Sequence, residues 1–238
     1  MRKIVLTAVA AALAGSMAFA ADTVRLGTEG AYAPWNFVND AGEIDGFERE
    51  LGDELCKRAE LECEWVKNDW DSIIPNLVGG NYDAIIAGMS ITDERDEVID
   101  FTTNYTPPDP SSYVAKSDGV DLEGGVIAAQ TGTIQAGYIA ESGATLVEFS
   151  TPEETIAAVK NGEADAVLAD SSYLAAIVDE DAELKFVGPD VALGGGVGMG
   201  IRESDTELKE KFNAAIQSMK DDGSLNELIA KWEVSTQF

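Results

Sequence analysis

The sequence predicts an α/β protein made of two similar lobes. Short apolar strands alternate with helical patterns along the chain, which is typical of parallel sheets covered by helices. One unit of helix, glycine turn and strand occurs twice, at residues 71–87 and 154–169, and in both copies a Gly stands three residues before an Asp-Ala pair. Glycine there is typical of a helix C-terminus. The repeat favours two lobes over one continuous sheet.

The first twenty residues are predicted to be a cleaved signal peptide. Arg2 and Lys3 precede an apolar run at 4–15, and Ala18-Phe19-Ala20 fits the small-x-small rule for cleavage before Ala21. The apolar run is too short to span a bilayer comfortably. No cysteine lies near the cleavage point, so we expect no lipid anchor. The mature chain is therefore expected to be free in the periplasm, without insertion into a membrane.

The elements expected in the first lobe run in the order strand, helix, strand, helix, strand. Phe47, Leu51 and Leu55 recur at helical spacing, and the last segment is a continuous apolar run of the buried type. The expected strands are 23–27, 62–66 and 82–87, and the expected helices are 46–59 and 70–78.

The second lobe repeats this alternation. We expect strands at 125–129, 145–149 and 164–169, and helices near 134–141, 152–160 and 171–178. A proline-rich stretch at 105–110, continued by 111–115, and a glycine-rich stretch at 194–201 are the two expected crossings between the lobes. Helices at 205–220 and 225–232 then return to the first lobe. The predicted division is therefore 21–108 and 196–238 for lobe 1, and 109–195 for lobe 2.

Composition excludes several functions. The net charge of −28 repels nucleic acid and anionic membranes, and it fits either a solubility adaptation or the steering of cationic solutes. The chain has no histidine, so a Ser-His-Asp or Cys-His catalytic pair is impossible. With only two cysteines, a zinc site is not expected, and no cofactor is indicated. Cys56 and Cys63 form an even pair in an exported chain, which suggests a disulfide between a helix end and the next strand.

Two charged residues are expected to face the gap between the lobes. Ligands of open α/β sheets lie beyond the carboxyl ends of the strands. Thr92 is a good N-cap, which places Arg95 in the first turn of a helix. There its guanidinium either binds an anion or forms an ion pair with neighbouring acids. Asp170 ends a strand, where it either caps the next helix or accepts from an ammonium group. On opposite lobes, the two would clamp a zwitterion when the lobes close.

An ordered set of motifs carries a family resemblance over essentially the whole mature chain. The set is Thr28-Glu-Gly-Ala-Tyr-Ala-Pro-Trp-Asn-Phe37, Gly46-Phe47-Glu48, Asp69-Trp70-Asp71, Met89-Ser-Ile-Thr-Asp-Glu-Arg95, Gln130-Thr-Gly-Thr-Ile-Gln135, Ala164-Asp-Ala-Val-Leu-Ala-Asp170 and Gly198-Met-Gly-Ile201. Together they resemble the polar amino-acid-binding proteins of bacterial ABC importers. The resemblance implies the type II, Venus-flytrap fold with two hinge strands, a monomer, and docking to an inner-membrane ABC permease.

The resemblance also implies the roles of individual residues. Arg95 would hold the α-carboxylate of an amino acid and Asp170 its α-ammonium. Ser90 and the backbone around Gly88 and Thr133 would add hydrogen bonds. Tyr32 and Trp70 would form the walls over the ligand side chain. Glu29 stands where the family members that bind cationic amino acids carry an acid.

The expected ligand is a basic amino acid, arginine first and then lysine or ornithine. A carboxylate at Glu29 favours a cationic terminus, and the face of Trp70 suits a guanidinium. Ala87-Gly88 stands where some relatives have two serines, and Ile134 replaces a hydroxyl residue, so the exact ligand stays open. The alternative roles of Glu29 as a loop cap and of Trp70 as a core residue leave a neutral ligand of the glutamine type open. We expect a binding protein rather than an enzyme. The alternatives are a cyclohexadienyl dehydratase on the same fold, with Glu29 as general acid, and a soluble sensor domain.

Overall fold

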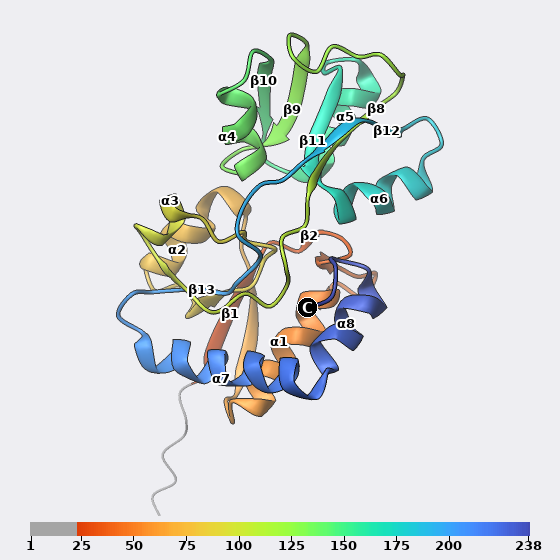
Figure 1. Ribbon diagram of the computed structural model, residues 1–238. Helices are drawn as coiled ribbons and strands as arrows, with labels where there is room; N and C mark the ends of the chain where they lie inside the picture. Colours follow the sequence, from red (N-terminus) through yellow and green to blue (C-terminus); the bar gives the residue numbers. More distant parts are fainter. Residues whose placement is uncertain (1–22) are drawn as a thin grey trace, which may run out of the picture.

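The computed structural model describes residues 23–238. The signal peptide expected at residues 1–20 lies outside the described residues. Within 23–238, no helix has the length and apolar character needed to cross a membrane. Figure 1 shows two lobes, with the C-terminal helices beside the first.

Lobe 1 is a five-stranded sheet with helices on both faces. The strand order is β5 (Cys63–Lys67), β1 (Val24–Thr28), β6 (Ala84–Ile85), β13 (Gly200–Ile201) and β7 (Asp100–Phe101). The first three strands are parallel, and β13 is antiparallel to its neighbours. One face packs against α1 (Phe47–Arg58), α7 (Thr206–Asp222) and α8 (Ser224–Trp232), and the other packs against α2 (Ile73–Val78).

Lobe 2 repeats this topology. Its strand order is β10 (Thr145–Phe149), β9 (Val126–Gln130), β11 (Ala166–Asp170), β8 (Ser111–Ala115) and β12 (Lys185–Val191). Again three parallel strands are followed by an antiparallel one. Helices α5 (Pro152–Asn161) and α6 (Ser171–Glu180) cover one face, and α4 (Ile134–Ala140) covers the other. The two-lobed α/β fold predicted from the repeat is confirmed.

The repeated unit is the same at the level of hydrogen bonds. Gly80 and Gly162 both have a positive φ, of 80° and 78°, at the end of their helices. Each helix ends with the paired backbone bonds of a Schellman motif, Asn81 to Asn76 with Gly80 to Leu77, and Glu163 to Ala158 with Gly162 to Val159.

The aspartate that follows each of these turns binds the neighbouring parallel strand of its own lobe, β1 in lobe 1 and β9 in lobe 2. Asp83 accepts from the backbone N–H of Arg25 at 3.0 Å, and Asp165 accepts from that of Val126 at 2.8 Å. The glycine and the aspartate therefore have one structural role in both lobes: they end a helix and start the central strand.

Two extended segments connect the lobes. One runs from the end of β7 to the start of β8, and the other from the end of β12 to the start of β13. They lie side by side, because Thr106 on the first pairs with Val197 on the second (Figure 1). The lobes are therefore joined by one narrow connection of two paired segments.

Several elements differ from the expectation. The helix expected at 70–78 begins as a 3₁₀ turn (Trp70–Ser72), and the strand expected at 82–87 is hydrogen-bonded as a strand only at Ala84–Ile85. Strand β12 was missed because Gly188 and Pro189 interrupt its pattern. The small sheet β2 (Ala31–Tyr32), β3 (Asn36–Val38) and β4 (Ile44–Asp45), with α3 (Asp93–Asp96), completes the fold; its strands are too short to show alternation.

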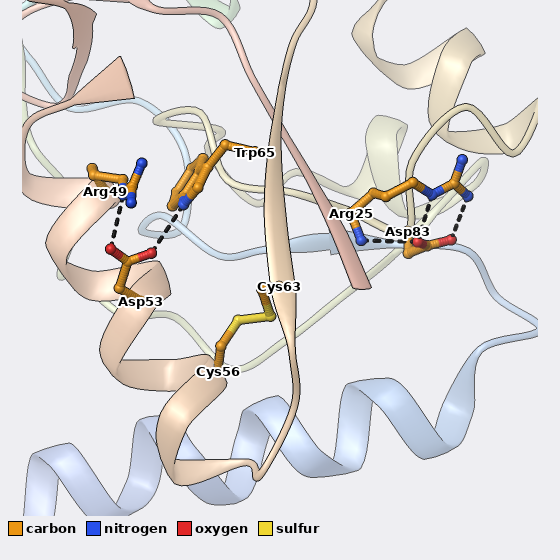
Figure 2. Close-up of a disulfide and its surroundings, with 7 residues drawn as sticks. All are labelled: Arg25, Arg49, Asp53, Cys56, Cys63, Trp65 and Asp83. Carbon is orange, nitrogen blue, oxygen red and sulfur yellow. Dashed lines mark hydrogen bonds and ion pairs between the residues drawn. A yellow bond between two sulfur atoms is a disulfide. The ribbon is translucent and has the colours of Figure 1, made fainter. Parts of the chain in front are cut away.

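The predicted disulfide is confirmed. Cys56 in α1 is bonded to Cys63 at the start of β5, with a Cα–Cα distance of 6.2 Å (Figure 2). It lies on the side of lobe 1 where α1 turns into β5, and neither cysteine lines the pocket described below. Its role is therefore structural.

Candidate functional site

A pocket between the two lobes brings all eight predicted site residues together. Its empty volume, including the part open to solvent, is about 350 Å³. It is formed where the parallel strands end: Glu29 follows β1, Gly88 follows β6, Gln130 ends β9 and Asp170 ends β11. This is the ligand position expected for open α/β sheets. The lining residues are Glu29, Tyr32, Trp70, Ala87, Gly88, Ser90, Arg95, Gln130, Thr133, Ile134, Gln135 and Asp170.

Arg95 is positioned by a short helix and turned into the pocket. The hydroxyl of Thr92 accepts from the backbone N–H of Arg95 at 3.2 Å, as the N-cap prediction required. The guanidinium donates to the backbone carbonyls of Ser90 at 2.9 Å and Gly132 at 3.2 Å. Gly132 belongs to lobe 2, so Arg95 also spans the gap between the lobes.

No carboxylate of the described residues pairs with Arg95. The neighbouring acids that could have neutralised it, Asp93, Asp96 and Glu97, form no ion pair with it in this part of the chain. Burial lowers the pKa of the guanidinium to about 10, partly offset by the charge of Asp170. A desolvated cation of this kind gains from an anion that enters the pocket.

Asp170 faces Arg95 from the other lobe. It ends β11 but makes no side-chain cap for α6, so the alternative of a helix cap is wrong. Its two oxygens accept from the hydroxyl of Tyr32 at 2.9 Å and the amide of Gln135 at 2.8 Å. Burial, with repulsion from Asp109, raises its pKa to about 7. Such a carboxylate is stabilised when a cation reaches it.

Glu29 lies on the wall formed by the loop after β1. It is 5% exposed and accepts from the side-chain amide of Gln130 at 2.6 Å. Burial is the main reason that its pKa rises to about 7, and the hydrogen bond from Gln130 opposes this. The pocket therefore contains one buried acid, Glu29, together with a half-buried acid, Asp170, and a half-buried guanidinium, Arg95.

Aromatic rings form the side walls. Tyr32 of lobe 1 stacks on Tyr173 of lobe 2, with ring centroids 4.2 Å apart. The guanidinium of Arg95 lies over the ring of Trp70, 5.3 Å from its centroid. One face of the Trp70 ring, which we expected to stack on a ligand guanidinium, therefore carries a guanidinium of the protein itself.

The backbone groups expected to bind a ligand are partly engaged already. The N–H of Gly88 donates to Glu48 at 2.6 Å, and Glu48 is fully buried and also accepts from Asn36 and Tyr105. The hydroxyl of Thr133 donates to the carbonyl of Gln130 at 2.7 Å. Because the Gly88 N–H already binds Glu48, the Gly88 carbonyl is the backbone group of this residue that can still bind a ligand.

Sequence reasoning missed Gln130 and Gln135, which both lie deep in the pocket. Each is buried, and each donates to one of the two pocket acids, Gln130 to Glu29 and Gln135 to Asp170. The signal that could have found Gln130 is its position at the end of β9, which occupies in lobe 2 the place that β1, the strand before Glu29, occupies in lobe 1.

Comparison with known proteins identifies the family. The profile of the bacterial extracellular solute-binding proteins, family 3, matches residues 24–235. The chain belongs to this family. The L-arginine-binding protein of Pseudomonas aeruginosa is 35% identical, over 90% of this chain and 89% of its own. The lysine/arginine/ornithine-binding periplasmic protein of Escherichia coli (strain K12) is 31% identical, over 92% and 90% respectively.

A solved structure is more similar to this family 3 protein. It is a periplasmic His/Glu/Gln/Arg/opine family-binding protein from Silicibacter pomeroyi in complex with lysine. It is 76% identical and covers 91% of this chain and 100% of its own, with a TM-score of 0.89. Within residues 23–238, the solute-binding protein has no group of three or more histidine, cysteine, aspartate or glutamate residues arranged to hold a metal ion.

Proposed function

We propose that the protein captures a free amino acid with a cationic side chain in this pocket and holds it between the two lobes. The observation that carries the proposal is a pair of charges on opposite walls that form no ion pair within residues 23–238: Arg95 from lobe 1 and Asp170 from lobe 2. An α-carboxylate satisfies the first and an α-ammonium the second. Each charge comes from a different lobe, so full binding requires the lobes, 21–108 with 196–238 and 109–195, to close.

Glu29, the third charged residue of the pocket, indicates the class of ligand side chain. Glu29 offers a carboxylate beyond the main-chain clamp, and the arginine- and lysine-binding names of the relatives support a basic side chain. A buried carboxylate that must be desolvated favours a cationic terminus over a neutral amide. Arginine, lysine and ornithine are therefore the proposed ligands. The order in which the protein ranks them is left to measurement.

The protein's place in transport follows from its family. We propose that the mature chain, released by cleavage after Ala20, works as a monomer in the periplasm and delivers the bound amino acid to the permease of an ABC importer. We propose capture without chemistry, because each charged group of the pocket has a role in binding: Arg95 and Asp170 in the clamp, and Glu29 at the ligand side chain.

The test is calorimetry with arginine, lysine, ornithine, histidine, glutamine and glutamate at moderate salt, repeated with Glu29→Gln. We expect the three basic amino acids to bind tightest, and Glu29→Gln to lose affinity for them while glutamine binding changes little. Tightest binding of glutamine or glutamate would reject the ligand class. Turnover of prephenate or arogenate by the same preparation would reject capture without chemistry.

A further inference from the structure

The wall of the pocket at Glu29 is made by both lobes. Glu29 comes from the loop after β1, and Gln130 comes from the end of β9, yet the Gln130 amide nitrogen lies 2.6 Å from the Glu29 carboxylate. Both side chains are buried, at 5% and 8% exposure. This contact forms only when the lobes face each other, because the two residues belong to different sheets.

The orientation of the Gln130 amide is fixed by its neighbours. Its nitrogen donates to Glu29 and also to the backbone carbonyl of Ser150, at 3.1 Å. Both neighbours are acceptors, so the atom between them must be the NH₂ group. Its carbonyl oxygen accepts from no donor among residues 23–238, and Gln130 lines the pocket. An acceptor is therefore left for a ligand beside the Glu29 carboxylate.

We propose that Gln130 is a second specificity-determining residue, whose carbonyl oxygen accepts from the terminal ammonium or guanidinium of the ligand while its amide nitrogen holds Glu29 in place. The inference rests on the proposed function, since it concerns the side chain of the same ligand. A cation then meets one acceptor from each lobe. Binding of the side chain, and not of the α-groups alone, therefore favours closure.

The charges around this wall agree with a cationic ligand. Asp69 and Glu153 act on Glu29 by repulsion and Lys67 by attraction, and Glu29 in turn acts on the hydroxyl of Tyr173. The two acids, Asp69 and Glu153, therefore face a single lysine, Lys67, around Glu29. A neutral side chain leaves the acids uncompensated, whereas an ammonium group offsets them.

The experiment compares lysine with norleucine, which has the same carbon chain but no terminal ammonium, by calorimetry on the mature protein. We expect Gln130→Leu to reduce lysine affinity by about tenfold to a hundredfold, the usual loss of a hydrogen bond to a charged group. Norleucine affinity should change by less than about threefold. The matched control is Gln135→Leu, which removes a pocket glutamine that binds Asp170 instead. It should weaken both ligands alike and leave their ratio unchanged.

The outcomes separate this inference from the proposed function. If the parent protein binds norleucine or glutamine more tightly than lysine, the proposed function itself fails. If the parent prefers lysine and Gln130→Leu keeps its lysine affinity within about threefold, only this inference fails. Equal losses for lysine and norleucine in Gln130→Leu, with an unchanged melting temperature, would show that Gln130 serves closure alone, and would also overturn it.

Discussion

Replacing Arg95 by alanine removes the only basic side chain among the residues that line the pocket. It deletes two hydrogen bonds to backbone carbonyls, at 2.9 and 3.2 Å, and the contact with the Trp70 ring. None of these contacts belongs to the core, because the Ser90 contact is part-buried, the Gly132 contact is exposed, and α3 has only four residues. The change therefore acts on binding rather than on folding.

The size of the effect follows from burial. Losing one partner of a buried, hydrogen-bonded charge pair costs about 2–5 kcal/mol, which is about 30-fold to several thousand-fold in affinity. The free protein should not be destabilised, because its guanidinium is desolvated without a carboxylate partner among the described residues. We therefore expect the melting temperature without ligand to stay the same or to rise.

The matched control is Arg49→Ala. Arg49 lies over the Trp65 ring at 5.5 Å, as Arg95 lies over Trp70, and it pairs with Asp53 on the outside of lobe 1 (Figure 2). Both variants change the net charge equally, so any loss of electrostatic steering is common to both. Calorimetry with lysine should show an affinity close to the parent for Arg49→Ala. If Arg95→Ala also binds within about threefold of the parent, Arg95 does not hold the ligand carboxylate and the clamp is wrong.

Three further predictions concern the other charges and the disulfide. Asp170→Asn should weaken a free amino acid by about tenfold or more, with little effect on its N-acetyl derivative, which has no ammonium to bind; equal losses for both would contradict the assignment. Burial raises the pKa of Glu29 and of Asp170 to about 7 each, and both must be ionised to meet cations. Lysine affinity measured by calorimetry should therefore fall as the pH drops through about 7, by up to about tenfold per unit for each group, and Glu29→Gln should remove part of this slope. Replacing Cys56 and Cys63 by serine should lower the free energy of unfolding in urea by about 2–3 kcal/mol, since the closed loop is short, and leave ligand affinity unchanged.

Local patterns explain why much of the fold could be predicted. Helix α1 and strand β10 follow directly from the spacing of apolar residues, and the glycine–aspartate turn before β6 and β11 is a property of a few neighbouring residues. The disulfide was predictable because the chain has only two cysteines. By contrast, β12 and the small sheet β2–β3–β4 were missed, since Gly188, Pro189 and very short strands leave no periodic signal.

The candidate site shows where sequence reasoning ends. By itself, the sequence determined the residue types that end the parallel strands, and so it indicated Gly88 and Asp170 at one edge of their sheets. Glu29 was indicated by the family resemblance. It left two alternatives open for both Arg95 and Asp170, because a neighbour along the chain could have satisfied either charge.

Only the tertiary structure decided between these alternatives. It turns Arg95 toward the carbonyls of Ser90 and Gly132 rather than toward the acids of its own helix, and it turns Asp170 toward Tyr32 across the gap. It also joins Glu29 to Gln130, which are 101 residues apart in the chain. The reason is physical: hydrogen bonding and apolar periodicity act over a few residues, whereas a charge buried between two lobes takes its partner from whichever strand ends opposite it.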